Sequence, residues 1–324
     1  MRKQPDVDVA VLLASFNGAR YIEDQIRSLA ANGTPFTLHW LDDHSTDHTR
    51  EVLRTVAASE GIPLREWHQP CRQGVPGAFF QLLEKVEADV YLFCDQDDIW
   101  QPQKIDVTVD NLRHDIALPV LSCSDALLFR DDIPGIFYRY SQVAHIDPSL
   151  SLRESRLFFP LFVNGHTQGF TRSLRELFLR HKEIARKYAC MHDEWMHVIA
   201  TASGGVRELT NAPTTLYRWH QSNVSQTFGG WTGKGKGYMA ASPRQLRSIR
   251  RAVARQAQGF ILAASTLPPG PKLVRLIEIA RFISDIDQRL PLTSVLRLIR
   301  GDIGWPNRRL SVQLALNCLY SHAH

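Results

Sequence analysis

Three apolar runs, each followed by an amphipathic segment, open the chain, and this alternation restricts the fold more than any other feature. The runs lie at 9–14, 36–41 and 64–67, and the residues after each run carry apolar side chains at helical spacing. Alternating strands and helices predict an α/β fold in which helices cover a parallel sheet. In such sheets, ligands bind beyond the carboxyl ends of the strands.

Polar side chains follow three of the expected strands at that edge of the sheet. They begin at Ser15, Asp42 and Asp95. The first of these turns lacks the GxGxxG pattern of dinucleotide-binding folds, and the sequence contains no GxxxxGK[ST] phosphate loop. A bound nucleotide would therefore have to be held by acidic side chains and a metal ion.

The third polar turn is the most acidic, because a strand expected at 89–94 stops abruptly at Asp95-Gln96-Asp97-Asp98. Three carboxylates in four positions repel one another unless a cation or buried donors offset their charge. Mg²⁺ and Mn²⁺ prefer such oxygen ligands. An exposed acidic turn or a helix N-cap is the alternative interpretation of these residues taken alone.

The middle of the chain continues with shorter elements. We expect a helix at 105–112, a strand at 120–129 and a strand at 214–219 that runs into His220. A glycine-bearing turn lies at 164–170. Asp193 lies near the start of a further helix, where an aspartate can serve as the N-cap.

The last part of the chain differs in charge from the rest. Residues 231–324 hold 15 of the 38 Lys and Arg residues but only 4 of the 33 Asp and Glu residues. Such asymmetry favours a basic module that meets an anionic surface, either a membrane or a phosphate-bearing acceptor. Ordinary solvated helix faces are the alternative.

These observations divide the chain into three parts. Residues 1–230 form the α/β domain, 231–241 form a linker or lid rich in Gly and Lys, and 242–324 form a helical basic module. We expect a basic amphipathic helix at 242–264 and another helix at 273–283. Lys234 and Lys236 would belong to the lid if it closes over a diphosphate.

Composition narrows the environment of the protein. The five cysteines are widely spaced and form no CxxC pair, which favours a reducing compartment over a zinc or disulfide framework. No segment has the ~20 apolar residues needed to span a bilayer. We therefore expect a cytoplasmic protein whose membrane contact, if any, is peripheral at the inner face of the cell membrane.

Several short motifs, taken together in their order along the chain, resemble family 2 glycosyltransferases of the GT-A fold. The DQDD form resembles their rhamnosyltransferase-like branch, and the resemblance covers about residues 8–225. It implies a GT-A type, Rossmann-like mixed sheet with helices on both faces. The motifs are ASFNG at 14–18, LDDHSTD at 41–47, CDQDD at 94–98, NGHT at 164–167, HD at 192–193 and YRWH at 217–220.

The resemblance implies a divalent metal, Mg²⁺ or Mn²⁺, that neutralises the diphosphate of a nucleotide sugar. Asp97 matches the direct metal ligand, and Asp95 matches the partner that reaches the ribose or the metal through water. His220 matches a histidine that closes the metal or diphosphate side. Asp98 is extra to the minimal motif, and its role stays open between orienting the metal and orienting the acceptor.

Other matched positions concern the donor and the acceptor. Asp43 matches an acid that accepts a hydrogen bond from the N3–H of uracil or thymine, and Asp193 matches the base that takes the acceptor proton in inverting enzymes. The loop at 165–167 matches one beneath the donor sugar. The expected nucleotide-sugar-binding residues are Ser15, Asn17, Asp42, Asp43, Gln73, Asp95, Gln96, Gly165, His166 and Thr167.

The function that the resemblance implies is the transfer of a sugar, expected to be L-rhamnose from dTDP-L-rhamnose, with inversion. The acceptor would be a bacterial surface polysaccharide or a lipid-linked glycan, and no nucleic-acid partner is expected. A UDP-hexose or UDP-N-acetylhexosamine donor is the alternative within this class. A nucleotidyltransferase or phosphohydrolase would need a basic phosphate loop, and a non-catalytic glycan-binding or scaffold protein would not need Asp95, Asp97 and Asp193 together.

Overall fold

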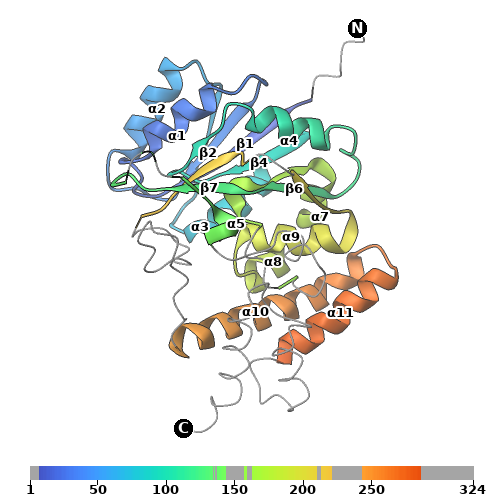
Figure 1. Ribbon diagram of the computed structural model, residues 1–324. Helices are drawn as coiled ribbons and strands as arrows, with labels where there is room; N and C mark the ends of the chain where they lie inside the picture. Colours follow the sequence, from blue (N-terminus) through green and yellow to red (C-terminus); the bar gives the residue numbers. More distant parts are fainter. Residues whose placement is uncertain are drawn as a thin grey trace.

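The computed structural model describes residues 7–133, 135, 137–143, 157–158, 163–209, 213–220 and 243–285. A seven-stranded sheet forms the centre of the molecule, with helices on both of its faces (Figure 1). Its strand order is β10-β6-β9-β4-β1-β2-β3. The strands are β1 (Val9–Ser15), β2 (Thr37–Asp42), β3 (Leu64–Trp67), β4 (Val90–Cys94), β6 (Val120–Ser124), β9 (Gly169–Thr171) and β10 (Gly205–Leu209).

The sheet is mixed, as the sequence predicts for a GT-A type fold. β3, β2, β1 and β4 run parallel to one another, and β6 runs parallel to β10. The short strand β9 lies antiparallel between β4 and β6. The register pairs Ser15 with Asp42 and Leu13 with Cys94, so the three polar turns do begin at one edge of the sheet.

Alternating side chains of β1 explain why helices cover both faces. Val9, Val11 and Leu13 belong to a core that includes residues of α1, α2 and α4, whereas Ala10 and Leu12 belong to a core that includes α3, α7 and α9. Both faces are therefore apolar, as expected for central parallel strands. The helices are α1 (Ile22–Ala30), α2 (Thr49–Ser59), α3 (Gly74–Lys85), α4 (Lys104–Leu112), α7 (Arg172–Arg180), α8 (Lys182–Tyr188) and α9 (His192–Ser203).

A second, four-stranded sheet borders the acidic turn, in the order β5-β11-β7-β8. It contains β5 (Ile99–Trp100), β7 (Ala126–Phe129), β8 (Tyr138–Arg139) and β11 (Thr215–Arg218), and the short helix α5 (Tyr140–Val143) follows β8. The single strand expected at 120–129 is therefore wrong, since β6 and β7 belong to different sheets. Asp125 separates them: its carboxylate accepts hydrogen bonds from the main chain of Ala126 (2.9 Å) and from the hydroxyl of Ser141 (2.7 Å).

Two C-terminal helices, α10 (Pro243–Ala263) and α11 (Pro271–Ser284), confirm the helices predicted there. They lie below α8 and α9 at the end of the molecule away from the sheet (Figure 1). Their buried residues, including Phe260 and Leu276, belong to the same core as Trp195 of α9. The division at 230 and 241 remains a prediction, and residues 231–241, with Lys234 and Lys236, lie outside the described residues.

Candidate active site

The three carboxylates of the acidic turn after β4 differ in how deeply they are buried. Asp95 and Asp97 are half-buried, whereas Asp98 is fully buried. One oxygen of Asp98 accepts a hydrogen bond from the main chain of Arg218 at 3.1 Å. The other lies 3.6 Å from Nδ1 of His166 and has no hydrogen-bond donor among the described residues. Asp98 therefore faces the protein interior and supports the turn from behind.

Close packing of acids makes the turn strongly negative. Burial, followed by the charges of Asp97 and Asp193, raises the pKa of Asp95 above its usual range. Burial and the charges of Asp97 and Asp95 likewise raise the pKa of Asp98 well above its usual range. A group that holds its proton this strongly lacks sufficient positive charge around it. The turn is therefore a site where a cation would stabilise the ionised form.

Asp193 lies close enough to the acidic turn for its charge to raise the pKa of Asp95, although it is far from the turn in sequence. It occupies the second residue of α9, and the N-cap residue Met191 makes no side-chain cap. Its two oxygens accept hydrogen bonds from the main chain of Gly165 (2.7 Å) and of Glu194 (2.8 Å). These donors fix the carboxylate while each oxygen keeps a lone pair for another partner.

His220 lies on the other side of the acidic turn, just after β11. Its Nε2 lies 3.0 Å from an oxygen of Asp97. The ring stacks on Tyr21 at a centroid distance of 4.6 Å. The structure thus brings together the four residues for which the sequence predicted metal binding or catalysis, which are Asp95, Asp97, Asp193 and His220.

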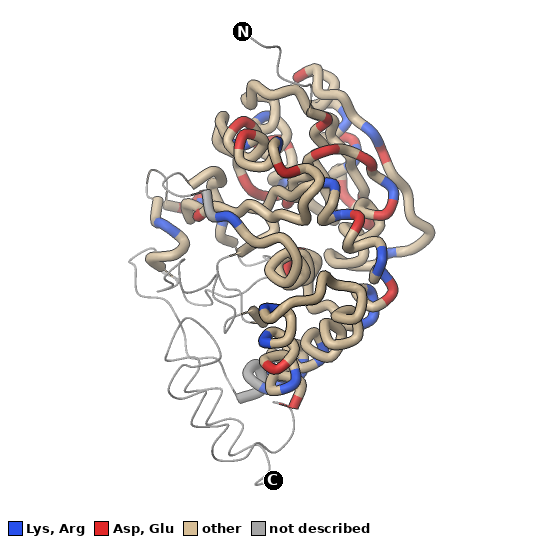
Figure 2. The backbone as a smooth tube through the Cα atoms, turned by 90° about the vertical axis from the view of Figure 1, so that its right-hand side faces the viewer, with Lys and Arg blue, Asp and Glu red and all other residues tan. Residues whose placement is uncertain are grey.

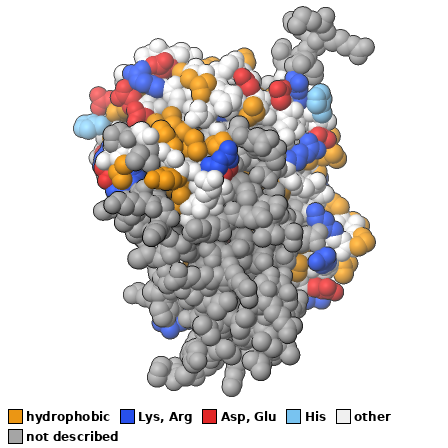
Figure 3. Space-filling view, viewed as in Figure 1, with side chains coloured by type: hydrophobic (Ala, Val, Ile, Leu, Met, Phe, Trp, Pro, Cys, Tyr) orange, Lys and Arg blue, Asp and Glu red, His pale blue; other side chains and the backbone are white. Residues whose placement is uncertain are grey.

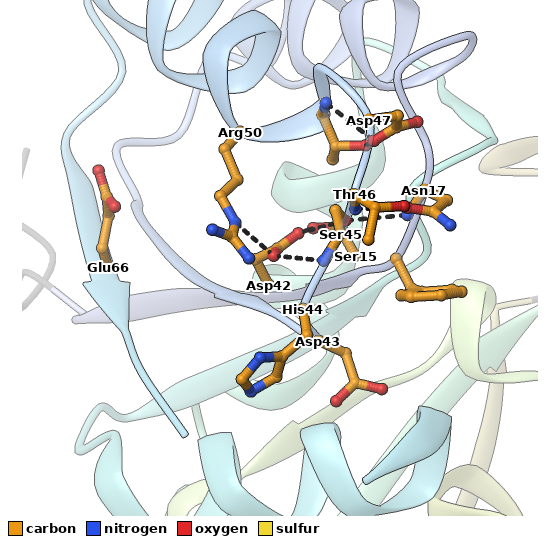
Figure 4. Close-up of polar contacts among 12 residues, drawn as sticks. Ser15, Asn17, Asp42, Asp43, His44, Ser45, Thr46, Asp47, Arg50 and Glu66 are labelled. Carbon is orange, nitrogen blue, oxygen red and sulfur yellow. Dashed lines mark hydrogen bonds and ion pairs between the residues drawn. The ribbon is translucent and has the colours of Figure 1, made fainter. Parts of the chain in front are cut away.

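The predicted base-binding residues lie at the ends of β1 and β2 (Figure 4). The carboxylates of Asp42 and Asp43 point in opposite directions. Asp42 accepts hydrogen bonds from Ser15 (3.0 Å), from the main chain of Ser45 (2.8 Å) and from Arg50 (2.6 Å). Burial raises the pKa of Asp42, but these bonds outweigh it and the net pKa is lowered. Asp42 is therefore occupied in holding the two loops together.

Asn17 links the same two loops. Its side-chain oxygen accepts a hydrogen bond from the main chain of Thr46 (2.8 Å), and its own main chain donates to Ser45 (2.9 Å). Asn17 adopts a positive φ of 48°. Asparagine tolerates this left-handed conformation better than most residues. Asn17 thus shapes the turn that leads into α1.

Asp43 faces the start of α3. Its oxygens accept hydrogen bonds from the main chain of Gln73 and Gly74, both at 2.8 Å, and from the side chain of Gln69. Arg72 lies 3.7 Å away and stacks on Phe16 at 3.6 Å from its ring centroid. A uracil or thymine N3–H that bonds to Asp43 would have to share or displace one of these donors.

Gln96 joins the acidic turn to the β1 loop. Its side-chain oxygen accepts from the main chain of Phe16 (2.9 Å), and its nitrogen donates to the carbonyl of the same residue (3.2 Å). A Cβ atom on Gly18 would lie 2.2 Å from the side-chain oxygen of Gln96. A side chain at position 18 would therefore push the Gln96 amide away from Phe16, and with it the link that Gln96 makes between two predicted binding loops.

The turn Gly165–Thr167, a short 3₁₀ helix labelled η2, is buried behind the acidic turn. His166 stacks on Tyr217 at 4.7 Å, and burial lowers its pKa to about 3. The hydroxyl of Thr167 donates to the carbonyl of Asn164 (2.8 Å). All three residues are buried, so they support the acidic turn from behind, and the main chain of Gly165 is already bonded to Asp193.

Lys104 is a residue of this region that the sequence did not single out. It is fully buried at the start of α4, donates to the carbonyl of His166 and to the hydroxyl of Thr215 (2.7 Å), and lies 3.9 Å from the ring centroid of Trp100. Burial lowers its pKa to about 7. Helical spacing places Lys104 with Thr108 on the buried side of α4, and that signal could have identified it.

A hollow of about 200 Å³ lies beside the Asp42 end of the site. Its arginines are already paired, Arg50 with Asp42 and Arg54 with Glu66. The acidic turn and Asp193 do not line it, so it borders the predicted base pocket without reaching the candidate chemical centre. The lining residues are Trp40, Asp42, His44, Arg50, Arg54, Glu66, Trp67, His68 and Gln69.

A metal ion would need ligands from outside the chain. In the described part of the protein, no group of three or more His, Cys, Asp or Glu side chains is arranged to hold a metal ion. Asp95, Asp97 and the nearby ring nitrogen of His220 are nevertheless suitable donors. Mg²⁺ sites that include a substrate phosphate commonly use only one or two protein carboxylates. The donor set therefore fits a metal shared with a diphosphate.

Comparison with known proteins identifies the family of the N-terminal part. Residues 10–130 match the model described as glycosyl transferase family 2. The dTDP-rhamnosyl transferase RfbG of Shigella flexneri is 24% identical over 220 residues, which cover 65% of this chain and 72% of that protein. An uncharacterized glycosyltransferase, alr2836 of Nostoc sp., is 30% identical over 103 residues, 32% of each protein.

Two solved structures are similar in fold. S. aureus TarS 1–349 in complex with UDP-GlcNAc has a TM-score of 0.57 and 14% identity, over 98% of this chain and 92% of that one. The mannosyltransferase PcManGT of Pyrobaculum calidifontis, in complex with GDP-Man and Mn²⁺, has a TM-score of 0.50 and 16% identity, over 99% and 91%. Residues 10–130 therefore match the family 2 glycosyl transferase model, and the fold of the chain matches that of these GT-A glycosyltransferase structures.

Proposed function

We propose that the protein is an inverting glycosyltransferase that transfers L-rhamnose from dTDP-L-rhamnose to a bacterial surface polysaccharide or lipid-linked glycan. The observation that carries the catalytic part is the placement of Asp193 beside the acidic turn, with both carboxylate oxygens oriented by main-chain donors. The choice of donor is supported by the similarity to the dTDP-rhamnosyl transferase of Shigella flexneri.

The reaction assigns one role to Asp193. An acceptor hydroxyl attacks the anomeric carbon, the new C–O bond forms as the bond to the nucleoside diphosphate breaks, and Asp193 takes the hydroxyl proton. A single displacement inverts the anomeric centre. The bonds from Gly165 and Glu194 hold the carboxylate in position, so little reorganisation is needed when the proton moves.

The donor would lie between the acidic turn and the ends of β1 and β2. We propose that Asp95, Asp97 and His220 hold Mg²⁺ or Mn²⁺, which when bound stabilises charge on the departing diphosphate. The proposed nucleoside site contains Ser15, Asn17, Asp42, Asp43, Gln73 and Gln96. Main chain near Gly165, followed by His166 and Thr167, would lie below the sugar.

The basic C-terminal helices suggest where the acceptor is met. On the described part of α10, Arg247, Arg251 and Arg255 are exposed at intervals of four residues, and Figure 2 shows Lys and Arg along the lower helices. Leu262 and Val274 are 52% and 59% exposed nearby. Figure 3 shows basic and hydrophobic side chains together where α11 lies. We propose peripheral contact with an anionic membrane, although no helix among the described residues could span one.

The donor assay uses a panel of nucleotide sugars, including dTDP-rhamnose, UDP-glucose and UDP-N-acetylglucosamine, with Mn²⁺ or with EDTA. We expect dTDP-rhamnose to give the fastest metal-dependent donor hydrolysis and the largest thermal shift. Asp97→Ala should abolish the effect of Mn²⁺ on donor binding. Faster turnover of a UDP sugar would replace the rhamnose assignment, and binding that ignores both EDTA and Asp97→Ala would remove the metal.

The base assignment is tested by Asp193→Asn. The amide keeps the shape and accepts from Gly165, but it cannot take a proton. We expect transfer to fall by about 10²- to 10⁴-fold while donor binding changes little. Glu194→Gln, next to it on α9, is the control for a general effect on the helix. Transfer at the wild-type rate in Asp193→Asn would remove Asp193 from this role.

A further inference from the structure

Arg218, the last residue of β11, has nearly every polar atom directed at the acidic turn or at the elements around it. Its side chain is 5% exposed. The Nε donates to the main-chain carbonyl of Asp97 at 2.9 Å, and one terminal nitrogen lies 2.8 Å from the carboxylate of Asp24 in α1. The other terminal nitrogen donates to Asp131, after β7. One guanidinium thus joins three separate segments.

The main chain of Arg218 holds the same turn at a second point. Its N–H donates to the carboxylate of Asp98 at 3.1 Å. The side chain and the main chain therefore grip two successive residues, Asp97 through its carbonyl and Asp98 through its carboxylate. The two contacts lie on either side of the peptide bond between Asp97 and Asp98, so they restrain the main chain that carries the Asp97 side chain.

Two aromatic rings, those of Tyr21 and Phe129, pack near the guanidinium of Arg218. Its central carbon lies 5.1 Å from the ring centroid of Tyr21 and 4.8 Å from that of Phe129. Tyr21 also stacks on His220, whose Nε2 contacts Asp97. The ring of Tyr21 therefore contacts both Arg218 and His220, the two residues at and just after the end of β11 that reach the acidic turn. A change at Arg218 would for this reason also disturb His220.

The chemistry of the site requires arginine rather than another cation. A buried charge is stable only when it is paired and hydrogen-bonded, and Asp24, Asp131 and the Asp97 carbonyl meet that condition together. The planar guanidinium supplies donors in three directions from one rigid group, whereas a lysine ammonium supplies a single compact point. Lysine at this position could keep the charge but not all three contacts.

We propose that Arg218 is a positioning residue that holds the acidic turn in the conformation that binds the donor. It acts through the main chain of Asp97 and the carboxylate of Asp98, without touching the donor itself. The identity of what the turn binds rests on the proposed function, but the positioning does not. Partners that orient ligands in this way typically account for 10- to 100-fold in metal affinity.

The experiment compares Arg218→Gln, Arg218→Lys and the double variant Asp24→Asn/Asp131→Asn with the wild-type protein. The double variant keeps the arginine but removes its two partly exposed carboxylates, so it leaves the core intact. Arg175→Lys is the matched control, because Arg175 is also buried and donates to main-chain carbonyls, of Leu83 (2.7 Å) and Glu84 (3.1 Å), away from the site. Thermal unfolding identifies any variant that fails to fold.

The first readout is amide hydrogen exchange of metal-free protein over residues 95–100. We expect exchange there to rise about tenfold in Arg218→Gln, less in Arg218→Lys, and measurably in the double variant, with no change in Arg175→Lys. Unchanged protection of this turn in folded Arg218→Gln, or in the double variant if Arg218→Gln does not fold, would overturn the proposal. So would an equal rise in Arg175→Lys.

The second readout is Mn²⁺ binding by calorimetry in the presence of saturating dTDP, which supplies diphosphate oxygens as the further metal ligands that the described part of the chain does not provide. We expect the affinity of Arg218→Gln to be about 10- to 100-fold weaker than that of the wild type, with Arg175→Lys unchanged. Equal affinities would overturn the proposal. If wild-type protein binds no Mn²⁺, the metal part of the proposed function fails, and the exchange result alone then supports or overturns the positioning role.

Discussion

Two main-chain N–H groups orient the carboxylate of the candidate base Asp193. One of them belongs to Gly165, which has little space around it for a side chain. A Cβ atom on Gly165 would lie 3.1 Å from Nε2 of His192 and 3.3 Å from both Cβ and Oδ2 of Asp193. These contacts are tighter than packed atoms usually allow, so a side chain here must move its neighbours by a few tenths of an ångström. The position of the base therefore depends on glycine at position 165.

Gly165→Ala should lower the rate of transfer through that displacement. A misplacement of 1 Å can cost about 100-fold in rate, so we expect a loss of about tenfold in kcat with donor binding nearly unchanged. Steady-state kinetics with the preferred donor measures both quantities. Gly33→Ala is the control, since a Cβ atom there would come no closer than 3.5 Å to a carboxylate oxygen of Asp106. An unchanged kcat would show that Asp193 tolerates the added methyl group.

Individual residues also show where inference from sequence stops. The motif order allowed Asp95, Asp97, Asp193 and His220 to be assigned to one site, and the structure brings them together. The direction of each side chain could not be predicted. Asp97 and Asp98 are adjacent and chemically identical in the sequence, yet Asp97 is half-buried and Asp98 faces the interior. The three-way pairing of Arg218 joins residues up to 194 positions apart and leaves no local pattern.

At the scale of elements, strands and helices with strong periodicity were predictable. The first three strand and helix pairs, α9, β11 and α10 all occur close to their expected positions. β9 was missed because it has only three residues and lies in a stretch that reads as a glycine-bearing turn. Its placement between β4 and β6 depends on Gly169, where a Cβ atom would lie 2.2 Å from a methyl group of Thr108. Such a contact exists only in the assembled fold.

The junction between α9 and β6 gives a prediction at this scale. A Cβ atom on Gly204, at the end of α9, would lie 2.2 Å from the carbonyl oxygen of Pro119 and 2.6 Å from its carbon. Both atoms belong to main chain, which cannot move aside as a flexible side chain can. Gly204→Ala should therefore destabilise the fold by about 1–3 kcal/mol, the usual range for overpacking.

Chemical denaturation measures this loss, with Gly33→Ala again as the control. Because α9 carries Asp193, the variant should also lose activity on heating earlier than the wild-type protein does. A free energy of unfolding equal to that of the wild type would mean that the end of α9 can shift away from Pro119 without cost.

At the scale of the whole molecule, the basic C-terminal helices are part of the core. Val253, Phe260, Leu273, Leu276 and Ile283 are buried in the cluster that contains α3 and α9. Burial of each large apolar side chain contributes roughly 1.5–3 kcal/mol, and the net stability of a domain is about 5–15 kcal/mol. Removal of these helices would therefore cost an amount comparable to the whole stability.

Truncation after residue 230 should consequently give an unstable or aggregated protein rather than an intact catalytic domain. Expression as soluble protein and the cooperativity of thermal unfolding measure this outcome. Membrane contact is better tested by the triple variant Arg247→Gln/Arg251→Gln/Arg255→Gln, which changes exposed positions and leaves the buried face of α10 in place. A truncated protein that unfolds cooperatively near the wild-type temperature would show that the α/β domain is independent of these helices.

The pH dependence of stability follows from histidines buried as neutral groups, of which His197 is the simplest. It is 1% exposed, burial alone lowers its pKa to about 4, and neither ring nitrogen has a hydrogen-bond partner among the described residues. The ordinary value of 6.5 applies when the chain is unfolded. Between these two values the unfolded state binds a proton that the folded state does not, so stability falls as the pH falls from 6.5 toward 4.

His197→Leu should remove this contribution and so flatten the acid side of the stability profile. A shift from 6.5 to about 4 corresponds to roughly 3 kcal/mol, so the variant should gain up to about that amount relative to the wild type as the pH falls from 7 to 4. Urea denaturation at several pH values measures the free energy of unfolding of both proteins. Titrations that both proteins share cancel in the difference between the two values. Parallel profiles for His197→Leu and the wild type would mean that the folded protein accommodates a charged His197.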